Sequence, residues 1–114
     1  MIAGRVLITG GGGQLASDLE ALLARTADVR SFERGRLDVT DQPAVERVFA
    51  DFRPQVVLNC AAFHNVDVCE REEARAFAVN ATAVKRLAAL SAEHGARFVH
   101  VSTNYVFDAL PWSP

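Results

Sequence analysis

Four consecutive glycines, Gly10 to Gly13, are the residues whose type and spacing point most directly to chemistry. They follow a short apolar run, precede leucines at helical spacing, and fit the pattern Gly-x-Gly-x-x-Ala that ends at Ala16. Glycines let the backbone approach a pyrophosphate closely, and a helix N-terminus offers free N–H groups and partial positive charge. The placement between strand and helix predicts a dinucleotide-binding loop, with a plain flexible turn as the alternative.

A charged group follows the expected second strand. Glu33 lies twenty residues after Gly13, where a carboxylate can accept hydrogen bonds from the ribose hydroxyls of a bound dinucleotide. Arg34 and Arg36 lie beside it and could instead meet a 2′-phosphate. The sequence therefore leaves NADH and NADPH both open, and a solvated charged turn is the simpler alternative.

Tyrosine and lysine are nearly absent from this sequence. Tyr105 is the single tyrosine, and Lys85, the single lysine, lies twenty residues before it. A Tyr-x-x-x-Lys pair, the arrangement that many reductases use for proton transfer, is therefore excluded within these residues.

The elements that would position these groups alternate between strand and helix. Strands are expected at 5–10, 29–32, 37–39, 56–62 and 98–101, and helices at 14–25, from Thr40 or Asp41 to just before Pro54, and at 73–94. Such alternation predicts an α/β fold, namely the first five strands of a Rossmann-like, doubly wound parallel sheet in the order 3-2-1-4-5. Residues 1–108 would form this incomplete domain, and 109–114 an irregular tail.

Apolar side chains assign faces to these helices. Leu15, Leu19, Leu22 and Leu23 would line the buried face of the first helix, and Val45, Val48, Phe49 and Phe52 that of the second. His100 alternates within the last strand and is expected to be a core histidine.

Composition narrows the classes of function. The 114 residues carry a formal net charge of −2 and are 50% hydrophobic, which fits one globular domain and gives no basic surface for nucleic acid. Cys60 and Cys69 lack metal-ligand spacing. No signal peptide and no apolar run of about 20 residues is visible, so a cytoplasmic protein without membrane contact is expected.

Six ordered blocks of sequence resemble the dTDP-4-dehydrorhamnose reductase family of extended short-chain dehydrogenases. They are Thr9-Gly10-Gly11-Gly12-Gly13-Gln14-Leu15, Leu37-Asp38-Val39-Thr40-Asp41, Arg53-Pro54-Gln55-Val56-Val57-Leu58-Asn59-Cys60-Ala61-Ala62, Val66-Asp67-x-x-Glu70, Val79-Asn80-Ala81-Thr82 and Ser102-Thr103-Asn104-Tyr105-Val106-Phe107-Asp108. Enzymes of this family reduce the 4-keto group of dTDP-4-dehydro-L-rhamnose with NADPH or NADH and form dTDP-L-rhamnose. The resemblance extends to about residue 108.

The resemblance also implies roles for single residues. Those implied to contact the cofactor are Gly13, Gln14 and Leu15 at the pyrophosphate, Glu33 at the adenosine ribose, Asp38 and Val39 at the adenine, and Ala62, Phe63 and His64 toward the nicotinamide half. Gly10, Arg34 and Val101 are expected to be further cofactor-binding residues. Thr103 would take the catalytic Ser/Thr position and donate a hydrogen bond to the substrate carbonyl, with Asn104 beside the substrate. No metal is implied.

Departures from the family pattern leave other functions open. Asn104 replaces an aspartate, His64 and Asn65 replace small residues, and the family's catalytic tyrosine and lysine belong downstream of residue 108. We therefore expect no activity from this chain alone. A non-catalytic dinucleotide-binding regulator and a nucleotide-sugar epimerase or dehydratase are the alternatives. The last strand would also be an open edge, which favours self-association.

Overall fold

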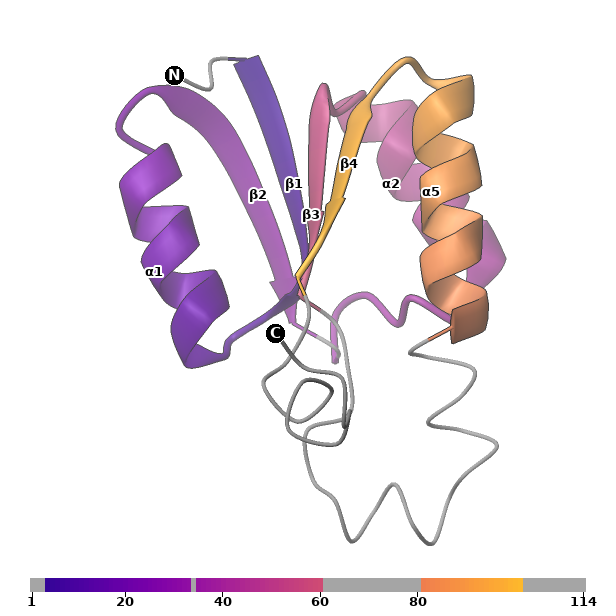
Figure 1. Cartoon of the computed structure of the whole chain (residues 1–114), viewed down its shortest axis with the longest axis horizontal. Coiled ribbons are helices and arrows are strands. Elements are labelled where there is room, and N and C mark those ends of the chain that lie inside the picture. The colour runs from indigo at the N-terminus through magenta and orange to yellow at the C-terminus, as the bar shows by residue number, and fades with distance from the viewer. Residues whose placement is uncertain (1–3, 34, 61–80, 102–114) are drawn as a thin grey trace, which may run out of the picture.

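The computed structural model describes residues 4–33, 35–60 and 81–101, which form a parallel sheet with helices on both faces (Figure 1). The strands are β1 (Gly4–Gly11), β2 (Ala27–Glu33), β3 (Val56–Asn59) and β4 (Arg97–His100), and the helices are α1 (Gln14–Leu23), α2 (Gln42–Phe52) and α5 (Ala83–Glu93). The strand order is β2-β1-β3-β4, and all three pairings are parallel. The predicted Rossmann-like α/β architecture is confirmed.

The predicted strand at 37–39 is wrong. The described sheet has four strands in the order 2-1-3-4, and not five in the order 3-2-1-4-5. Asp38 Oδ1 accepts hydrogen bonds from the backbone N (2.9 Å) and Oγ1 (2.6 Å) of Thr40, which closes a local turn. Side-chain bonding of this kind competes with a strand ladder. Leu37 and Val39 are nevertheless buried, because this turn packs against the core.

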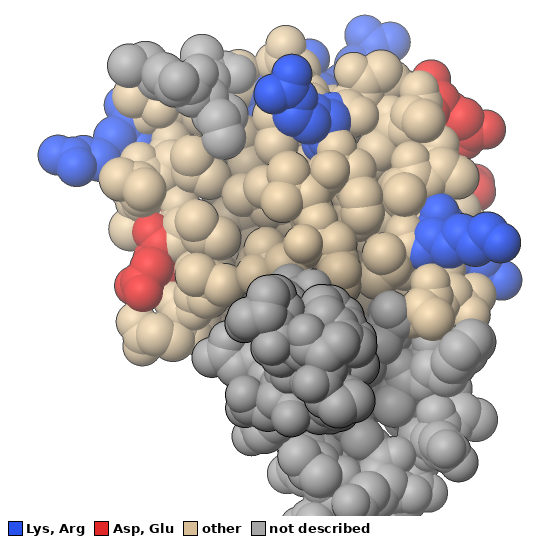
Figure 2. All heavy atoms as spheres, in the orientation of Figure 1, with Lys and Arg blue, Asp and Glu red and all other residues tan. Residues whose placement is uncertain are grey.

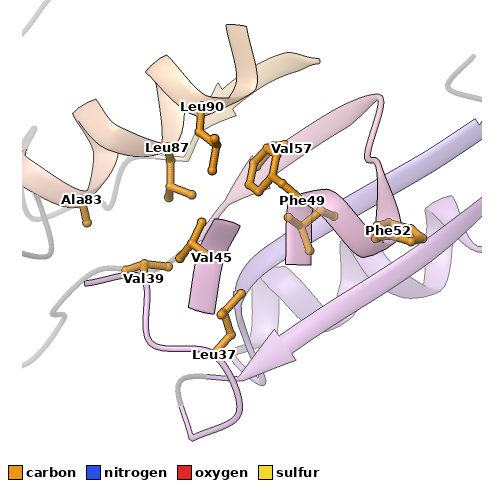
Figure 3. Close-up of a cluster of buried hydrophobic side chains, with 10 residues drawn as sticks. Leu37, Val39, Val45, Phe49, Phe52, Val57, Ala83, Leu87 and Leu90 are labelled. Carbon is orange, nitrogen blue, oxygen red and sulfur yellow. The ribbon is translucent and has the colours of Figure 1, made fainter. Parts of the chain in front are cut away.

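The larger part of the core lies between the sheet and the pair α2 and α5, which share one face (Figures 1 and 3). It contains Leu7 and Val57 from the sheet, with buried side chains from α2 and α5 and from the turn before α2: Leu37, Val39, Val45, Phe49, Phe52, Ala83, Leu87 and Leu90. The predicted apolar face of α2 is confirmed, with Val48 partly buried at its margin.

The opposite face of the sheet is covered by α1 alone among the described helices (Figure 1). Val6, Ile8, Ala16 and Leu58 form its core, and Leu19 and Leu23 pack against them. The predicted apolar face of α1 is partly wrong, because Leu15 and Leu22 are 51% and 59% exposed. The helix also ends at Leu23 rather than at residue 25.

Helix ends follow the local chemistry of the sequence. Asp41 caps α2, since its Oδ1 accepts a hydrogen bond from the backbone N of Ala44 (3.3 Å), and Pro43 lies in the first turn. Arg53 ends α2 in the left-handed region with φ of 54°, before Pro54. Gly95, with φ of 69°, follows α5 as predicted. The part of the predicted helix before residue 81 lies outside the described residues.

Candidate cofactor site at the carboxyl edge of the sheet

The glycine loop leaves the sheet through an irregularity at the end of β1. The register of β1 against β2 shifts between Thr9 and Gly11, and Gly11 then pairs with Glu33. Gly10 and Gly12 have φ of 74° and 93°, a left-handed conformation that side chains with a Cβ rarely adopt. Glycine at positions 10 and 12 is thus required by the backbone path between β1 and α1.

Close packing constrains two of these glycines and spares the third. A Cβ on Gly11 would collide with Ser31 Oγ, and one on Gly12 would lie 2.6 Å from Glu33 Oε1. A Cβ on Gly13 would meet no atom within 4 Å among the described residues. The Glu33 carboxylate therefore lies against the loop at Gly12, while no described residue fills the space over Gly13.

The start of α1 faces the same space. Gly13 is its N-cap, and no side chain of the described residues caps this end. The first hydrogen bond of the helix runs from the N of Ser17 to the O of Gly13 (2.9 Å), so the preceding amides have no partner within the helix. Gln14 Nε2 donates to the Asp18 carboxylate at 3.1 and 3.2 Å, so its amide group lies along the helix. Free amides and the helix dipole suit an anionic group here.

The other cofactor residues predicted within the described region lie at this carboxyl edge as well. Leu15 is exposed in the first turn of α1, and Glu33 is exposed at the end of β2. Asp38 is held by its hydrogen bonds to Thr40, and the Val39 side chain is buried in the core. An adenine contact from Val39 would therefore have to come from its backbone. Val101 follows β4 and donates its N–H to the O of Asn59 (3.0 Å).

Six of the predicted site residues lie outside the described residues. They are Arg34, Ala62, Phe63, His64, Thr103 and Asn104. Their roles stay predictions.

A polar layer that sequence reasoning missed closes the core at this edge. Thr9 Oγ1 donates to Asn59 Oδ1 (2.7 Å), and Asn59 Nδ2 lies 3.2 Å from His100 Nδ1. Thr9 and Asn59 are fully buried, whereas His100 is exposed, so its prediction as a core histidine is wrong. The sequence does carry one indication of this layer, namely position. Each of the three residues stands two places after a side chain that belongs to the larger core or packs against it, near the carboxyl end of its strand.

Cys60 follows this layer directly after β3, and its N donates to the O of Thr9 (2.8 Å). Burial raises the pKa of the Cys60 thiol, which therefore stays protonated at neutral pH and is a poor nucleophile. The described residues contain no group of His, Cys, Asp and Glu able to hold a metal ion.

Two hollows formed by described residues lie at the opposite, amino edge of the sheet. One, of about 340 Å³, is lined by Arg5, Arg53, Pro54, Gln55, His94 and Gly95, and the other lies where α1 leads into β2. Arg5 Nε donates to the O of Arg53 (2.7 Å), which caps the C-terminus of α2. These hollows are separate from the glycine loop. In the described part of the chain, no helix has the length and apolar character needed to cross a membrane.

Comparison with known proteins agrees with this geometry. The family described as "RmlD substrate binding domain" matches residues 4–114. A dTDP-4-dehydrorhamnose reductase of Mycobacterium tuberculosis is 49% identical over 105 residues, which are 91% of this chain and 34% of that protein. The crystal structure of dTDP-4-dehydrorhamnose reductase from Bacillus anthracis in complex with NADP superimposes with a TM-score of 0.85 at 35% identity, covering 97% of this chain and 40% of that one.

A more distant relative shares the fold. UDP-glucose 4-epimerase of Thermus thermophilus, solved with NAD, has a TM-score of 0.69 at 33% identity and covers 80% of this chain. This chain spans about a third of the length of the Mycobacterium tuberculosis reductase. Because the family match runs over residues 4–114, the chain belongs to the dTDP-4-dehydrorhamnose reductase family, and it corresponds to the N-terminal part of the longer members that it matches.

Proposed function

We propose that this chain provides the NAD(P)-binding part of a dTDP-4-dehydrorhamnose reductase, which reduces the 4-keto group of dTDP-4-dehydro-L-rhamnose to give dTDP-L-rhamnose. The observation that carries the proposal is the glycine loop. Gly12 lies against the Glu33 carboxylate, and open space lies over Gly13 at the N-terminus of α1. A dinucleotide needs both features, one for its ribose hydroxyls and one for its pyrophosphate.

Each part of the site would act by a simple interaction. The unpaired amides at the start of α1 donate to pyrophosphate oxygens, and Glu33 accepts from the adenosine ribose. The NAD(P)H cofactor, when bound, supplies the hydride. Thr103 donates a hydrogen bond to the substrate carbonyl oxygen as negative charge develops there, and Asn104 lies beside the substrate. These last two roles rest on the family resemblance alone.

Cofactor preference would depend on the charges around Glu33. Its carboxylate favours the free 2′-hydroxyl of NADH, whereas Arg34 and the exposed Arg36 favour the 2′-phosphate of NADPH. The Bacillus anthracis relative was solved with NADP, which supports the use of NADPH. We propose that the site accepts both dinucleotides, with NADPH preferred.

Proton transfer is the step that these 114 residues would not perform alone. Their single tyrosine and single lysine stand in the wrong order and at the wrong spacing for a Tyr-x-x-x-Lys pair. We therefore expect no turnover of NADPH with dTDP-4-dehydrorhamnose by the isolated chain. A non-catalytic regulator of the same fold would share this property, so affinity must separate the two. An epimerase is less well supported, since the Thermus thermophilus epimerase matches with a lower TM-score and less of the chain than the Bacillus anthracis reductase.

A chimera tests the function. Residues 1–108 of this chain replace the matching segment of the Mycobacterium tuberculosis reductase, which keeps the remainder of that enzyme. The chimera is expected to oxidise NADPH in the presence of dTDP-4-dehydrorhamnose, and the same chimera carrying Gly13→Ala to lose most of that activity. A folded chimera that binds NADPH but leaves this substrate unchanged would contradict the assignment to the reductase.

Calorimetry on the isolated chain separates the regulator from the partial enzyme. The residues expected to clasp the nicotinamide half are few here, so the dissociation constant for NADPH should be weaker than about 1 µM, a binding free energy less favourable than about −8 kcal/mol. Tighter binding would favour a self-sufficient regulator instead.

A further inference from the structure

Two neighbouring glycines of the candidate cofactor loop lie against side chains of β2. A Cβ on Gly11 would collide with Ser31 Oγ, and one on Gly12 would lie 2.6 Å from Glu33 Oε1. Ser31 and Glu33 stand two places apart on one strand, so their side chains share one face of the sheet. The loop therefore rests on two successive side chains of the same face of β2.

This face of β2 is the one that α1 covers. Ser31 is the register partner of Ile8, which belongs to the core under α1. Ser31 thus lies between that core and the loop, where the register of β1 against β2 shifts after Thr9. The chain leaves the sheet at this point, and it reaches the N-cap of α1 at Gly13 only two residues after Gly11.

Contact, rather than backbone conformation, restricts position 11. Gly10 and Gly12 have positive φ angles and Gly11 does not, so the backbone at Gly11 would accept a side chain. The next atoms that a Cβ there would meet are the backbone C and O of Phe32, both at 3.4 Å, which is an ordinary van der Waals distance. Ser31 Oγ is therefore the atom that limits how closely the loop approaches β2.

From these contacts we infer that Ser31 is a positioning residue of the candidate cofactor site. A side chain of this size lets Gly11 lie close to β2, which sets the separation between the amides at the start of α1 and the Glu33 carboxylate. A dinucleotide must reach both groups at once, one with its pyrophosphate and the other with its adenosine ribose. The inference rests on the proposed function for the identity of the ligand, whereas the contact between Ser31 and Gly11 does not depend on it.

A double-mutant cycle tests the contact itself. Gly11→Ala should lower the urea midpoint of the 114-residue chain, because the new methyl group and Ser31 Oγ compete for the same space. Ser31→Ala removes Oγ, so Gly11→Ala should cost much less stability in that background. Equal losses in the two backgrounds would overturn the inference, and failure of both chains to fold counts as equal losses. A Gly11→Ala chain that folds only together with Ser31→Ala would support it.

Variants at position 31 test positioning with every glycine of the loop in place. Ser31→Val puts carbon where the hydroxyl lies, and valine favours a strand, so β2 itself should not be weakened. Ser31→Val should shift the amide signals of Gly11, Gly12 and Gly13 much further than Ser31→Ala does. Val29→Ile enlarges a side chain of the same face two places earlier, and as the matched control it should leave these signals unchanged. Loop signals that move no further in Ser31→Val than in Ser31→Ala would contradict a positioning role.

Dinucleotide affinity adds a readout that a loss of stability alone would not produce. With each variant fully folded, Ser31→Val should weaken NADPH and NADH binding alike by about tenfold, the effect of losing one hydrogen bond to a charged group of the shared pyrophosphate. Ser31→Ala and Val29→Ile should bind both dinucleotides nearly as tightly as the unsubstituted chain. A change in the affinity ratio of NADPH to NADH for Ser31→Val would contradict an effect on the pyrophosphate amides.

The positioning role and the proposed function fail on different results. If neither the unsubstituted chain nor Ser31→Ala binds a dinucleotide while the cycle and the loop signals behave as expected, the proposed function is wrong and Ser31 still limits the approach of the loop. If NADPH binds the unsubstituted chain and binds Ser31→Val equally well, the positioning role is wrong and the proposed function stands.

Discussion

Gly12 and Gly13 are neighbours in sequence but face different demands. Gly12 combines a φ of 93° with a close approach to Glu33, whereas Gly13 has a φ of −82° and open space where a Cβ would project. Gly12→Ala should therefore lower the free energy of unfolding by about 1–3 kcal/mol in urea titration, the usual cost of a strained backbone position. Gly13→Ala should cost less, about 0.5–1 kcal/mol, since alanine is a poorer helix N-cap than glycine but the position adds no backbone strain.

These two variants separate folding from binding. Gly13→Ala places a methyl group in the space that a pyrophosphate would need, so it should weaken NADPH binding while lowering stability less than Gly12→Ala does. Equal stabilities for the two variants would contradict the loop geometry, and undiminished binding by Gly13→Ala would contradict the location of the cofactor.

Glu33 is the residue expected to discriminate between the two dinucleotides. Its exposed carboxylate would repel the 2′-phosphate of NADPH, so Glu33→Gln should raise the affinity ratio of NADPH to NADH about fivefold, which is on the order of 1 kcal/mol for charges at an exposed site. Calorimetric titration with each dinucleotide measures the ratio. Glu46→Gln, at an exposed position of α2, is the matched control and should leave the ratio unchanged. A fall in the affinity ratio of NADPH to NADH for Glu33→Gln would contradict the proposed position of Glu33 beside the 2′ position of the adenosine ribose.

At the scale of elements, α2 depends on a cap that the sequence predicts. Asp41 accepts from the N of Ala44, so Asp41→Ala should cost about 1 kcal/mol of stability. Asp51→Ala is the control at the other end of the helix, where the carboxylate makes only an exposed ion pair with Arg30 at 3.3 Å. That change should cost no more than a few tenths of a kcal/mol. If urea unfolding showed equal losses of stability for Asp41→Ala and Asp51→Ala, Asp41 would not stabilise α2 as a cap.

The helix ends and turns also show which local features can be predicted from the sequence. The glycine-to-helix transition, the cap at Asp41 and the stop at Gly95 were predictable because each depends on neighbours in the chain. The turn at 37–39 was not, since buried Leu37 and Val39 resemble a strand and only the Asp38–Thr40 hydrogen bonds reveal otherwise. The exposure of Leu15 and Leu22 depends on which side of α1 meets the sheet, and helical spacing leaves that choice open.

The site shows the same division between local and distant determinants. Spacing from Gly13 was enough to place Glu33 beside the loop, because strand, turn and helix lengths vary little in this unit. The row of Thr9, Asn59 and His100 needs the register of three strands that are far apart in sequence, and no local pattern supplies that register.

At the scale of the whole molecule, β4 is an edge of the described sheet, paired with β3 alone. Val99 is 42% exposed, and residues other than Lys, Arg, Asp and Glu make up most of the described part of the face shown in Figure 2. An open edge strand that exposes Val99 and carries Arg97 as its one charged residue favours association, so the isolated chain should form dimers or larger species with increasing concentration.

Sedimentation of the chain over a range of concentrations measures this association. Val99→Lys should reduce it, because a charge on an edge strand opposes pairing with another chain. Arg97→Lys, on the same strand, keeps the charge and serves as the control. A chain that remains monomeric at all concentrations would contradict association through the open edge of β4.

The central claim is that a dinucleotide binds at the carboxyl edge of the sheet. Amide spectra of the ¹⁵N-labelled chain, titrated with NADPH to about 1 mM, test it directly, because this range detects binding free energies as weak as about −4 kcal/mol. Saturable shifts are expected at the glycine loop and at Glu33, and none at Arg5, Gln55 and Gly95 around the opposite hollow. Shifts confined to that hollow, or an unperturbed glycine loop at the end of the titration, would contradict it.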